Sequence, residues 1–305
     1  MSYGKIYETT WWGNPVTDGW GGVYAALSSD PTEFRFTVKT DNAGTSNNDQ
    51  FTLPLDNTFS SITAKVDWGD GNTDDITTYN QSEVTHTYSS AGTYTIKITN
   101  ALKGWRFNNG GDKLKMLEIQ NWGVFELNKN KAFKGCNNLT MSATDEPTIT
   151  STSMAEIFND CFALVSTSGF SGWDMSSVTN ISQMLRDTLM NAPINAWDVS
   201  NVTNMTSFLA GNEAFNQDIS SWDVGKVTTG SNFLLSGTAF STANYDALLI
   251  GWEATLQSQF PNGSGYSLSP SWRFQTAYTG GGAAATARAS LVSNYNWTIV
   301  DLGTA

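Results

Sequence analysis

Apolar residues recur at fixed distances around three Trp-Asp pairs in the second half of the chain. In each copy an apolar residue precedes the Trp by three positions and a Val follows it by five. The pairs recur at steps of 24 and 25 residues, at Trp173-Asp174, Trp197-Asp198 and Trp222-Asp223. Repetition of this length and regularity predicts stacked structural repeats, which bury a shared core that no single repeat could close.

Each repeat is expected to supply one strand, one corner and one short helical turn. The strands are centred on Phe170, Ile194 and Ile219. The Trp packs the corner, and the Asp accepts hydrogen bonds from the turn that follows it. The helical turn is expected to be capped by Thr179, Thr203 and Thr228. These elements together predict a solenoid of stacked coils.

The two cysteines fall at equivalent repeat positions. The segments AFKGCNNL (132–139) and IFNDCFAL (157–164) align so that Cys136 and Cys161 are 25 residues apart. Thr188 and Thr238 stand at comparable places in later copies. We expect small buried side chains here without redox chemistry. Spacing leaves open whether the two sulfurs are bridged, although cytoplasmic synthesis favours free thiols.

Before the repeats, residues 34–100 show the alternation of short strands. The runs FRFTVKT, QFTLPL and ITAKVDW are followed by VTHTYSSAGTYTIKIT, and Asp70-Gly71 predicts a tight hairpin between two of the strands. Five or so short strands over this length predict a small β-sandwich.

The two ends of the chain differ from this pattern. Near the C-terminus, Tyr245, Leu248, Leu249 and Trp252 share one helical face, as expected of a cap on the last repeat. Residues 1–32 are rich in aromatic side chains, including those of Trp11, Trp12 and Trp20. So short a segment forms no core alone. Its aromatic density predicts either a small subdomain core or an anchor that docks on another subunit or a symmetry copy, and its shortness gives the anchor equal weight.

Charge narrows the range of partners. The net charge is −12, and only 14% of residues are charged. This balance argues against nucleic acid and anionic membranes. No run approaches the roughly 18 apolar residues of a membrane span, and no secretory apolar region follows Met1. We therefore expect synthesis in a cytoplasm and no membrane insertion. A basic cluster ahead of the repeats is expected to be a solvated face; it comprises Lys103, Arg106, Lys113, Lys115, Lys129, Lys131 and Lys134.

Two family resemblances follow from these segments. VDWGDG…VTHTYSSAGTYTIKI resembles the PKD-type immunoglobulin-like module. WDVSNVTNM and FNQDISSWD, with AFKGC upstream, resemble the BspA-like leucine-rich-repeat surface proteins. The resemblances imply a multidomain, mainly β chain with an adhesive role and no catalytic residues. The predicted domains are an aromatic anchor (1–32), a PKD-like sandwich (33–103), a leucine-rich-repeat solenoid (104–240) and a C-terminal cap (241–305).

Catalytic chemistry finds little support in the residue inventory. His86 is the single histidine and is expected to be a sandwich residue rather than part of a triad. Asp174, Asp198 and Asp223 recur with the repeat, which indicates turn formers rather than paired glycosidase carboxylates. A cluster around the GDG turn could hold calcium or be a hairpin with solvated acids; it comprises Asp67, Asp70, Asp74 and Asp75. No other metal, no cofactor and no nucleotide site is expected.

The function expected from the sequence is therefore non-enzymatic. We expect a structural and adhesion protein of a bacteriophage virion, on the tail, fibre or capsid, which attaches to a host-surface glycan or protein. The N-terminal segment would join it to other virion proteins in many copies or as a homo-oligomer. The alternatives are a bacterial cell-surface or secreted adhesin and a carbohydrate-active enzyme.

Overall fold

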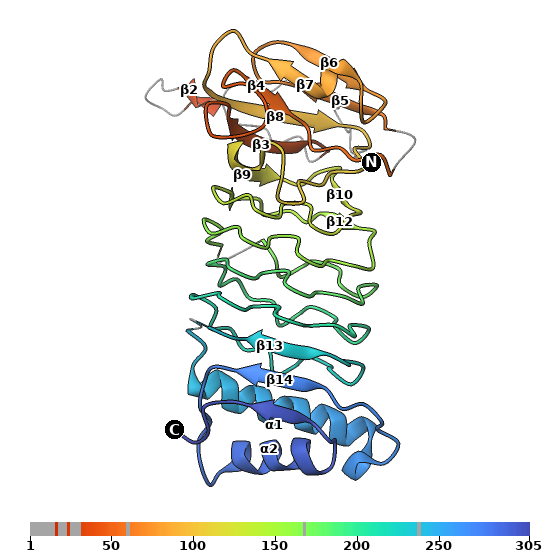
Figure 1. The fold of residues 1–305 in the computed structure, drawn as a ribbon, viewed down its shortest axis with the longest axis vertical. Coiled ribbons are helices and arrows are strands. Elements are labelled where there is room, and N and C mark those ends of the chain that lie inside the picture. The colour runs from red at the N-terminus through yellow and green to blue at the C-terminus, as the bar shows by residue number, and fades with distance from the viewer. Residues whose placement is uncertain (1–15, 18–22, 25–31, 59–61, 167–168, 237–238) are drawn as a thin grey trace, which may run out of the picture. The chain divides into compact units, whose positions relative to one another are not determined.

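The computed structural model describes residues 16–17, 23–24, 32–58, 62–166, 169–236 and 239–305. The chain divides into two compact units, Met1–Pro31 and Thr32–Ala305. In the first unit, β1 (Val16–Thr17) and β2 (Val23–Tyr24) form an antiparallel pair. Every feature described below belongs to the second unit, which is drawn in Figure 1 from β3 to the C-terminus.

A six-stranded mixed sheet opens the second unit. Its order is β11-β9-β3-β8-β5-β6. The strands are β3 (Phe34–Lys39), β5 (Ala64–Asp67), β6 (Thr73–Ile76), β8 (Thr93–Thr99), β9 (Met116–Asn121) and β11 (Thr140–Met141). The alternation of the sequence appears directly as alternating burial in β5. The hairpin predicted at Asp70-Gly71 is present between β5 and β6.

A second, two-stranded sheet packs against the first. It pairs β4 (Gln50–Thr52) with β7 (Thr85–Thr87), which follows the 3₁₀ turn η1 (Ser82–Val84). The rings of Phe36 in β3 and Phe51 in β4 lie 6.1 Å apart, and both are fully buried. This contact places two sheets face to face within residues 34–99, the region for which a small sandwich was predicted, and we refer to it below as the sandwich.

The large sheet does not end at residue 103. Strand β3 is antiparallel to β8 on one side and to β9 on the other, and β9 is parallel to β11. The alternating run MLEIQN therefore completes the sheet of the preceding segment and also starts the stacked region. The two regions share backbone hydrogen bonds rather than a linker.

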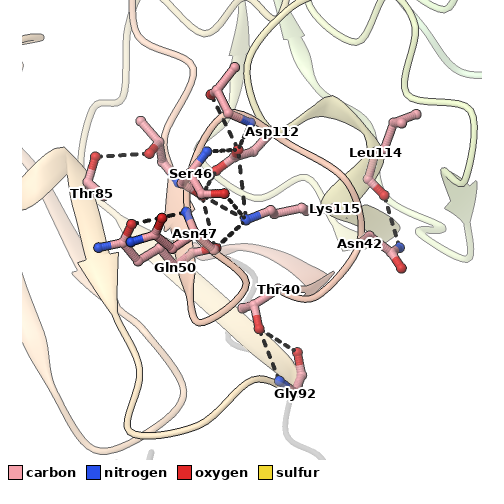
Figure 2. A network of polar contacts seen from close by, with 12 residues as sticks. Thr40, Asn42, Ser46, Asn47, Gln50, Thr85, Gly92, Asp112, Leu114 and Lys115 are labelled. Atoms are coloured by element: carbon pink, nitrogen blue, oxygen red, sulfur yellow. Dashed lines mark hydrogen bonds and ion pairs between the residues drawn. The ribbon is translucent and has the colours of Figure 1, made fainter.

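A buried ion pair fastens this junction. Lys115 and Asp112 are 0% and 1% exposed. They lie at the 3₁₀ turn η2 (Lys113–Lys115), against the loop between β3 and β4. Lys115 Nζ donates to the carbonyls of Asn47 (2.7 Å) and Gln50 (2.9 Å) and to Ser46 Oγ (2.7 Å), as Figure 2 shows.

The carboxylate of Asp112 completes the network. It accepts from the backbone N–H groups of Thr45, Ser46 and Thr52 at 2.8–3.0 Å and from Ser46 Oγ at 2.6 Å. Burial lowers the pKa of Lys115, and Asp112 opposes that shift. The surrounding carbonyls can only accept, so they require a protonated ammonium group. The prediction that Lys115 belongs to a solvated basic face is therefore wrong.

Beyond the junction the repeats stack, but the predicted leucine-rich-repeat solenoid is wrong. β10 (Glu126–Leu127) and β12 (Thr148–Ile149) pair in parallel. From residue 150 to residue 229, the described residues contain no further strand. Successive repeats meet there through single-residue parallel bridges, Ser153–Asn180, Asn180–Asn204 and Asn204–Thr229. No solenoid sheet forms.

At the expected strand centres the backbone bonds to indole side chains and closes turns. The carbonyls of Phe170, Ile194 and Ile219, the expected strand centres, accept hydrogen bonds from indole N–H groups in the following segment. The donors are Trp197 (2.6 Å), Trp222 (3.0 Å) and Trp252 (3.1 Å). The same carbonyls also accept the backbone N–H three residues on, at 3.2–3.3 Å, so each closes a turn instead of pairing with a neighbouring strand. The indoles stack in turn, with 6.3 Å between the rings of Trp197 and Trp222.

The predicted helical turns are also absent, because two successive four-residue turns replace each of them. In one repeat the turns close at Ile157 N–H to the Met154 carbonyl and at Cys161 N–H to the Phe158 carbonyl. The third residue of each turn is left-handed, at Glu156 (φ 58°) and Asp160 (φ 63°). The same two positions recur as Lys131/Gly135, Gln183/Asp187, Ser207/Gly211 and Asn232/Ser236.

These turns bond each repeat to the next one along the chain. Alternate N–H groups of the turns donate to carbonyls of the following repeat at 2.8–3.1 Å; in one repeat the donors are Met154, Glu156, Phe158 and Asp160. The threonines predicted as helix caps bond in the opposite direction, to the preceding repeat. The hydroxyls of Thr179, Thr203 and Thr228 each donate to a carbonyl of the preceding repeat at 3.0–3.1 Å.

The C-terminal segment closes the stack with a regular layer. The parallel sheet β13-β14-β15 consists of β13 (Gly230–Leu234), β14 (Ser271–Phe274) and β15 (Thr298–Val300). The connections contain α1 (Thr242–Gln259), the 3₁₀ turn η3 (Pro261–Gly263) and α2 (Ala283–Ser293). Both helices lie beside this sheet in Figure 1. The predicted helical face is confirmed, since Tyr245, Leu248, Leu249 and Trp252 are buried. None of the described helices is long and apolar enough to span a membrane.

Replacement of Lys115 by Met should destabilise the protein by about 3–5 kcal/mol, because Asp112 would stay buried without its counter-charge. Lys103→Met is the control, since Lys103 makes no ion pair or hydrogen bond with the other described residues. Urea unfolding measures both variants. The double variant Asp112→Asn/Lys115→Met should recover part of the loss. A wild-type midpoint for Lys115→Met would show that the network contributes nothing.

Trp197→Ala should cost about 3–5 kcal/mol, because it opens a cavity in the core and leaves the Phe170 carbonyl without its donor. Thermal melts should use the whole chain, since β3 pairs with β9 across residue 103. Phe162→Ala, at a ring that is 51% exposed, is the control and should change stability by less than about 0.5 kcal/mol. Equal melting temperatures for the two variants would contradict a core role for Trp197.

Candidate functional site

A groove follows the left-handed turns along one side of the stack. Three hollows form it, and neighbouring hollows share lining residues: Asp187 and Gly211 join the first to the second, and Leu235 and Ser236 join the second to the third. We call it the turn groove. The first hollow is lined by Phe162, Asp187, Thr188, Leu189, Gly211 and Glu213.

Exposed apolar side chains stand at both ends of the turn groove. Phe162 is 51% and Leu189 36% exposed in the first hollow. Val300 is 48% and Leu302 66% exposed in the third. Exposed apolar side chains at both ends make the turn groove the candidate site among the described residues.

Asp187 stands where the first and second hollows meet. Its Oδ2 lies 3.0 Å from Nε of Arg186, whose Nη1 donates to Gln183 Oε1. Burial raises the pKa of the Asp187 carboxyl and the Asp160 carboxylate adds to the rise, although Arg186 opposes it. A fixed carboxylate of this kind can accept hydrogen bonds from a ligand hydroxyl or amide.

Gly211 makes room for that carboxylate. Its φ is +73°, and a Cβ built on it would lie 2.0 Å from Oδ1 of Asp187. Any side chain at this position would therefore push Asp187 out of its place. The backbone conformation and the space both call for glycine here.

The third hollow has a different character. Arg273 in β14 is exposed and makes no ion pair with the described residues, while Asp301 is bonded to Arg288 Nε (2.7 Å) and to the Tyr245 hydroxyl (2.8 Å). The free charge at this end is thus positive. The turn groove changes from acidic to basic along its length.

The predicted repeat residues occupy the core and the corners. Trp173, Trp197 and Trp222 are at most 3% exposed. Each paired Asp accepts a hydrogen bond from the backbone two residues on: Asp174 from Ser176, Asp198 from Ser200 and Asp223 from Gly225, at 2.9–3.0 Å. None of them lines the turn groove.

The two cysteines are buried free thiols. Cys136 and Cys161 are fully buried, and Cys161 Sγ lies 3.1 Å from the Phe133 carbonyl. Burial raises the pKa of both thiols. Their place in the repeat is taken by Thr188 in the next copy, which bonds to Asn212 of the copy after it. Thr238, the other predicted equivalent, lies outside the described residues.

The acidic residues at the hairpin are engaged in local hydrogen bonds. Asp67 accepts from Gly69 N–H (2.9 Å), and Asp74 accepts from the Trp68 indole (2.8 Å). Asp75 stands opposite Lys65 in the register of the β5–β6 ladder. No group of three or more His, Cys, Asp or Glu side chains suited to a metal ion occurs in the part of the chain that the structure describes. The predicted calcium candidate therefore gains no geometric support.

Asp70, the fourth of these residues, contacts the single histidine. Its Oδ2 lies 2.8 Å from His86 Nε2. Burial alone would raise the pKa of Asp70, but the bonds from His86 and Asn72 more than offset it and hold the pKa below its usual value. The His86 ring stacks on Trp68 at 4.8 Å. His86 thus packs as a residue of the sandwich.

The sequence did not indicate the turn groove. Part of the site that it did predict lies outside the described residues. Trp11, Trp12 and Trp20, the predicted anchor, belong to that part of the chain. The lining of the turn groove comes from segments as far apart as Phe162 and Leu302. The one signal within the sequence was a large apolar residue at Phe162, where the equivalent position of the preceding copy is Asn137.

Comparison with known proteins gives one partial match. A family model described as "Mycoplasma protein of unknown function, DUF285" matches residues 152–255, which contain all three Trp-Asp pairs and most of α1. Searches of curated proteins and of solved structures found no match. The resemblance to BspA-like leucine-rich-repeat proteins is therefore wrong as a family assignment, since the matched family is a different one and the described repeats form no solenoid sheet. The resemblance to the PKD module is wrong as well, since none of the comparisons matches residues 33–103 to it.

Gly211→Ala should destabilise the protein more than Gly281→Ala. Both glycines have φ +73°, but a Cβ at Gly281 would meet nothing within 4 Å. Gly281→Ala thus measures the left-handed strain alone, about 1–2 kcal/mol. Urea unfolding should show a further loss for Gly211→Ala, and this further loss should disappear in the Asp187→Ala background. Equal losses for the two single variants would contradict the close approach of Asp187.

Proposed function

We propose that the chain is a non-enzymatic attachment protein that presents the turn groove of a rigid repeat stack to the surface of a target cell. The observation that supports this most is the pair of exposed apolar side chains at each end of the turn groove, Phe162 with Leu189 and Val300 with Leu302. Exposed apolar groups of this kind cost solubility, which a binding surface explains.

The rigidity of the groove also supports attachment. Its walls are turn residues whose backbone N–H groups are bonded to the following repeat, as Asp187 is to Ala210 (2.9 Å) and Gly211 to Leu235 (2.8 Å). Groups that are ordered before a ligand arrives lose little further entropy on binding. Several copies carried on one particle would add their contacts, so weak single-site binding would give firm attachment.

Attachment without cleavage is the outcome to test. Purified protein should be incubated with intact cells of several bacteria, mycoplasma included because the matched family carries that description. Retained protein and released surface fragments should both be measured. We expect saturable retention on at least one cell type and no release of fragments above that from untreated cells.

Two results would contradict the proposal. Steady release of saccharide or peptide fragments that depends on the protein would identify an enzyme. A complete lack of retention on every cell type, with the protein folded by its melting curve, would remove the attachment role. If retention on the cells is the same at about 50 mM and about 300 mM salt, attraction between surface charges is not the main source of binding.

A further inference from the structure

We propose that the first hollow of the turn groove binds a neutral saccharide, with Phe162 as the surface on which a sugar ring stacks and Asp187 and Glu213 as hydroxyl acceptors. This inference rests on the proposed attachment function and gives it a place and a ligand class. Three observations carry it: an aromatic ring at a corner where some other repeats have a polar residue, a carboxylate held in place, and a small negative net charge.

The ring of Phe162 is exposed without a structural reason. It follows Cys161 directly, and the residues that follow the equivalent positions in other repeats are Asn137, Leu189 and Glu213. The repeat therefore accepts a polar side chain at this corner. A half-exposed phenyl ring next to carboxylates offers an apolar face for the C–H groups of a sugar and acceptors for its hydroxyls.

The carboxylate of Asp187 is oriented before any ligand binds. Arg186 holds Oδ2, and Gly211 leaves space beside Oδ1, as its missing Cβ would lie 2.0 Å from that atom. Glu213 lies in the same hollow and is exposed. Two acceptor groups at different depths beside one ring are suited to a ligand with several hydroxyl donors on one edge.

Charge favours an uncharged ligand. The charged side chains lining the first two hollows are Arg186, Asp187 and Glu213, so their formal charges sum to −1; Arg186 pairs with Asp187, which leaves the charge of Glu213. The other polar lining groups are neutral, among them Thr188, Ser207 and Asn232. The net negative charge of the chain would repel a polyanion, and a polycation would gain only a small net attraction at this hollow.

The test uses the full chain and named neutral probes: maltoheptaose, cellohexaose, mannohexaose and N-acetylchitohexaose. Saturation-transfer NMR detects contact, and calorimetry gives the affinity. We expect at least one of them to bind with a Kd below about 1 mM. Phe162→Ala and Gly211→Ala should each weaken that binding about tenfold. Val165→Ala, at an exposed residue outside the hollows, and Gly281→Ala are the matched controls and should bind as wild type does.

The controls make a negative result informative. Absence of saturation transfer to all four probes, or equal affinity for Phe162→Ala and wild type, would overturn the inference. Binding of polylysine in place of the sugars would identify a cationic protein segment as the ligand and would also overturn it. If wild type and Phe162→Ala adhere equally to cells, the attachment function stands while the saccharide site falls. If neither adheres, both fall.

Discussion

The hydrogen bonds that run from each pair of turns to the next repeat are the interactions on which this fold depends. In the turns, N–H groups point toward the following repeat and the carbonyls face the preceding one, as in the bonds from Asp160 to Arg186 and from Asp187 to Ala210. A repeat by itself would leave both sets of groups without partners, and buried groups of this kind are costly. The stack must therefore be closed at both ends.

The two ends of the stack meet this demand in different ways. At the start, Phe107 and Asn108 donate to the carbonyls of Ala132 and Lys131, so the segment leaving the sandwich serves as a first set of donors. At the finish, β13 adopts the extended conformation and pairs in parallel with β14. Trp252 of α1 continues the column of indole donors by bonding to the Ile219 carbonyl. Both terminal regions thus supply hydrogen-bond partners for the end repeats of the stack.

The sequence reveals the repeat but hides the conformation of its turns. The Trp-Asp spacing correctly indicates stacked copies, and the helical face of α1 follows from its apolar period. Some of the left-handed positions carry Glu156, Gln183 and Ser207, none of which is a residue that normally marks a positive φ. In the sequence, Lys115 looks like the other lysines near it. Its burial depends on the loop at Ser46, which is distant along the chain. The turn groove has no local signal because its walls are brought together only by stacking.

The junction between sandwich and stack bears on how such a groove could work. A chain of separate modules joined by flexible linkers would spread each binding site over a wide volume and dilute the gain from many copies. Here β3 pairs with β9, and Lys115 ties the loop at Ser46 to the start of the stack. Within residues 32–305, bending at this point would break ladder hydrogen bonds and expose a buried charge pair. The groove is therefore held in a fixed direction relative to the sandwich, which is the property that the proposed attachment function requires of it.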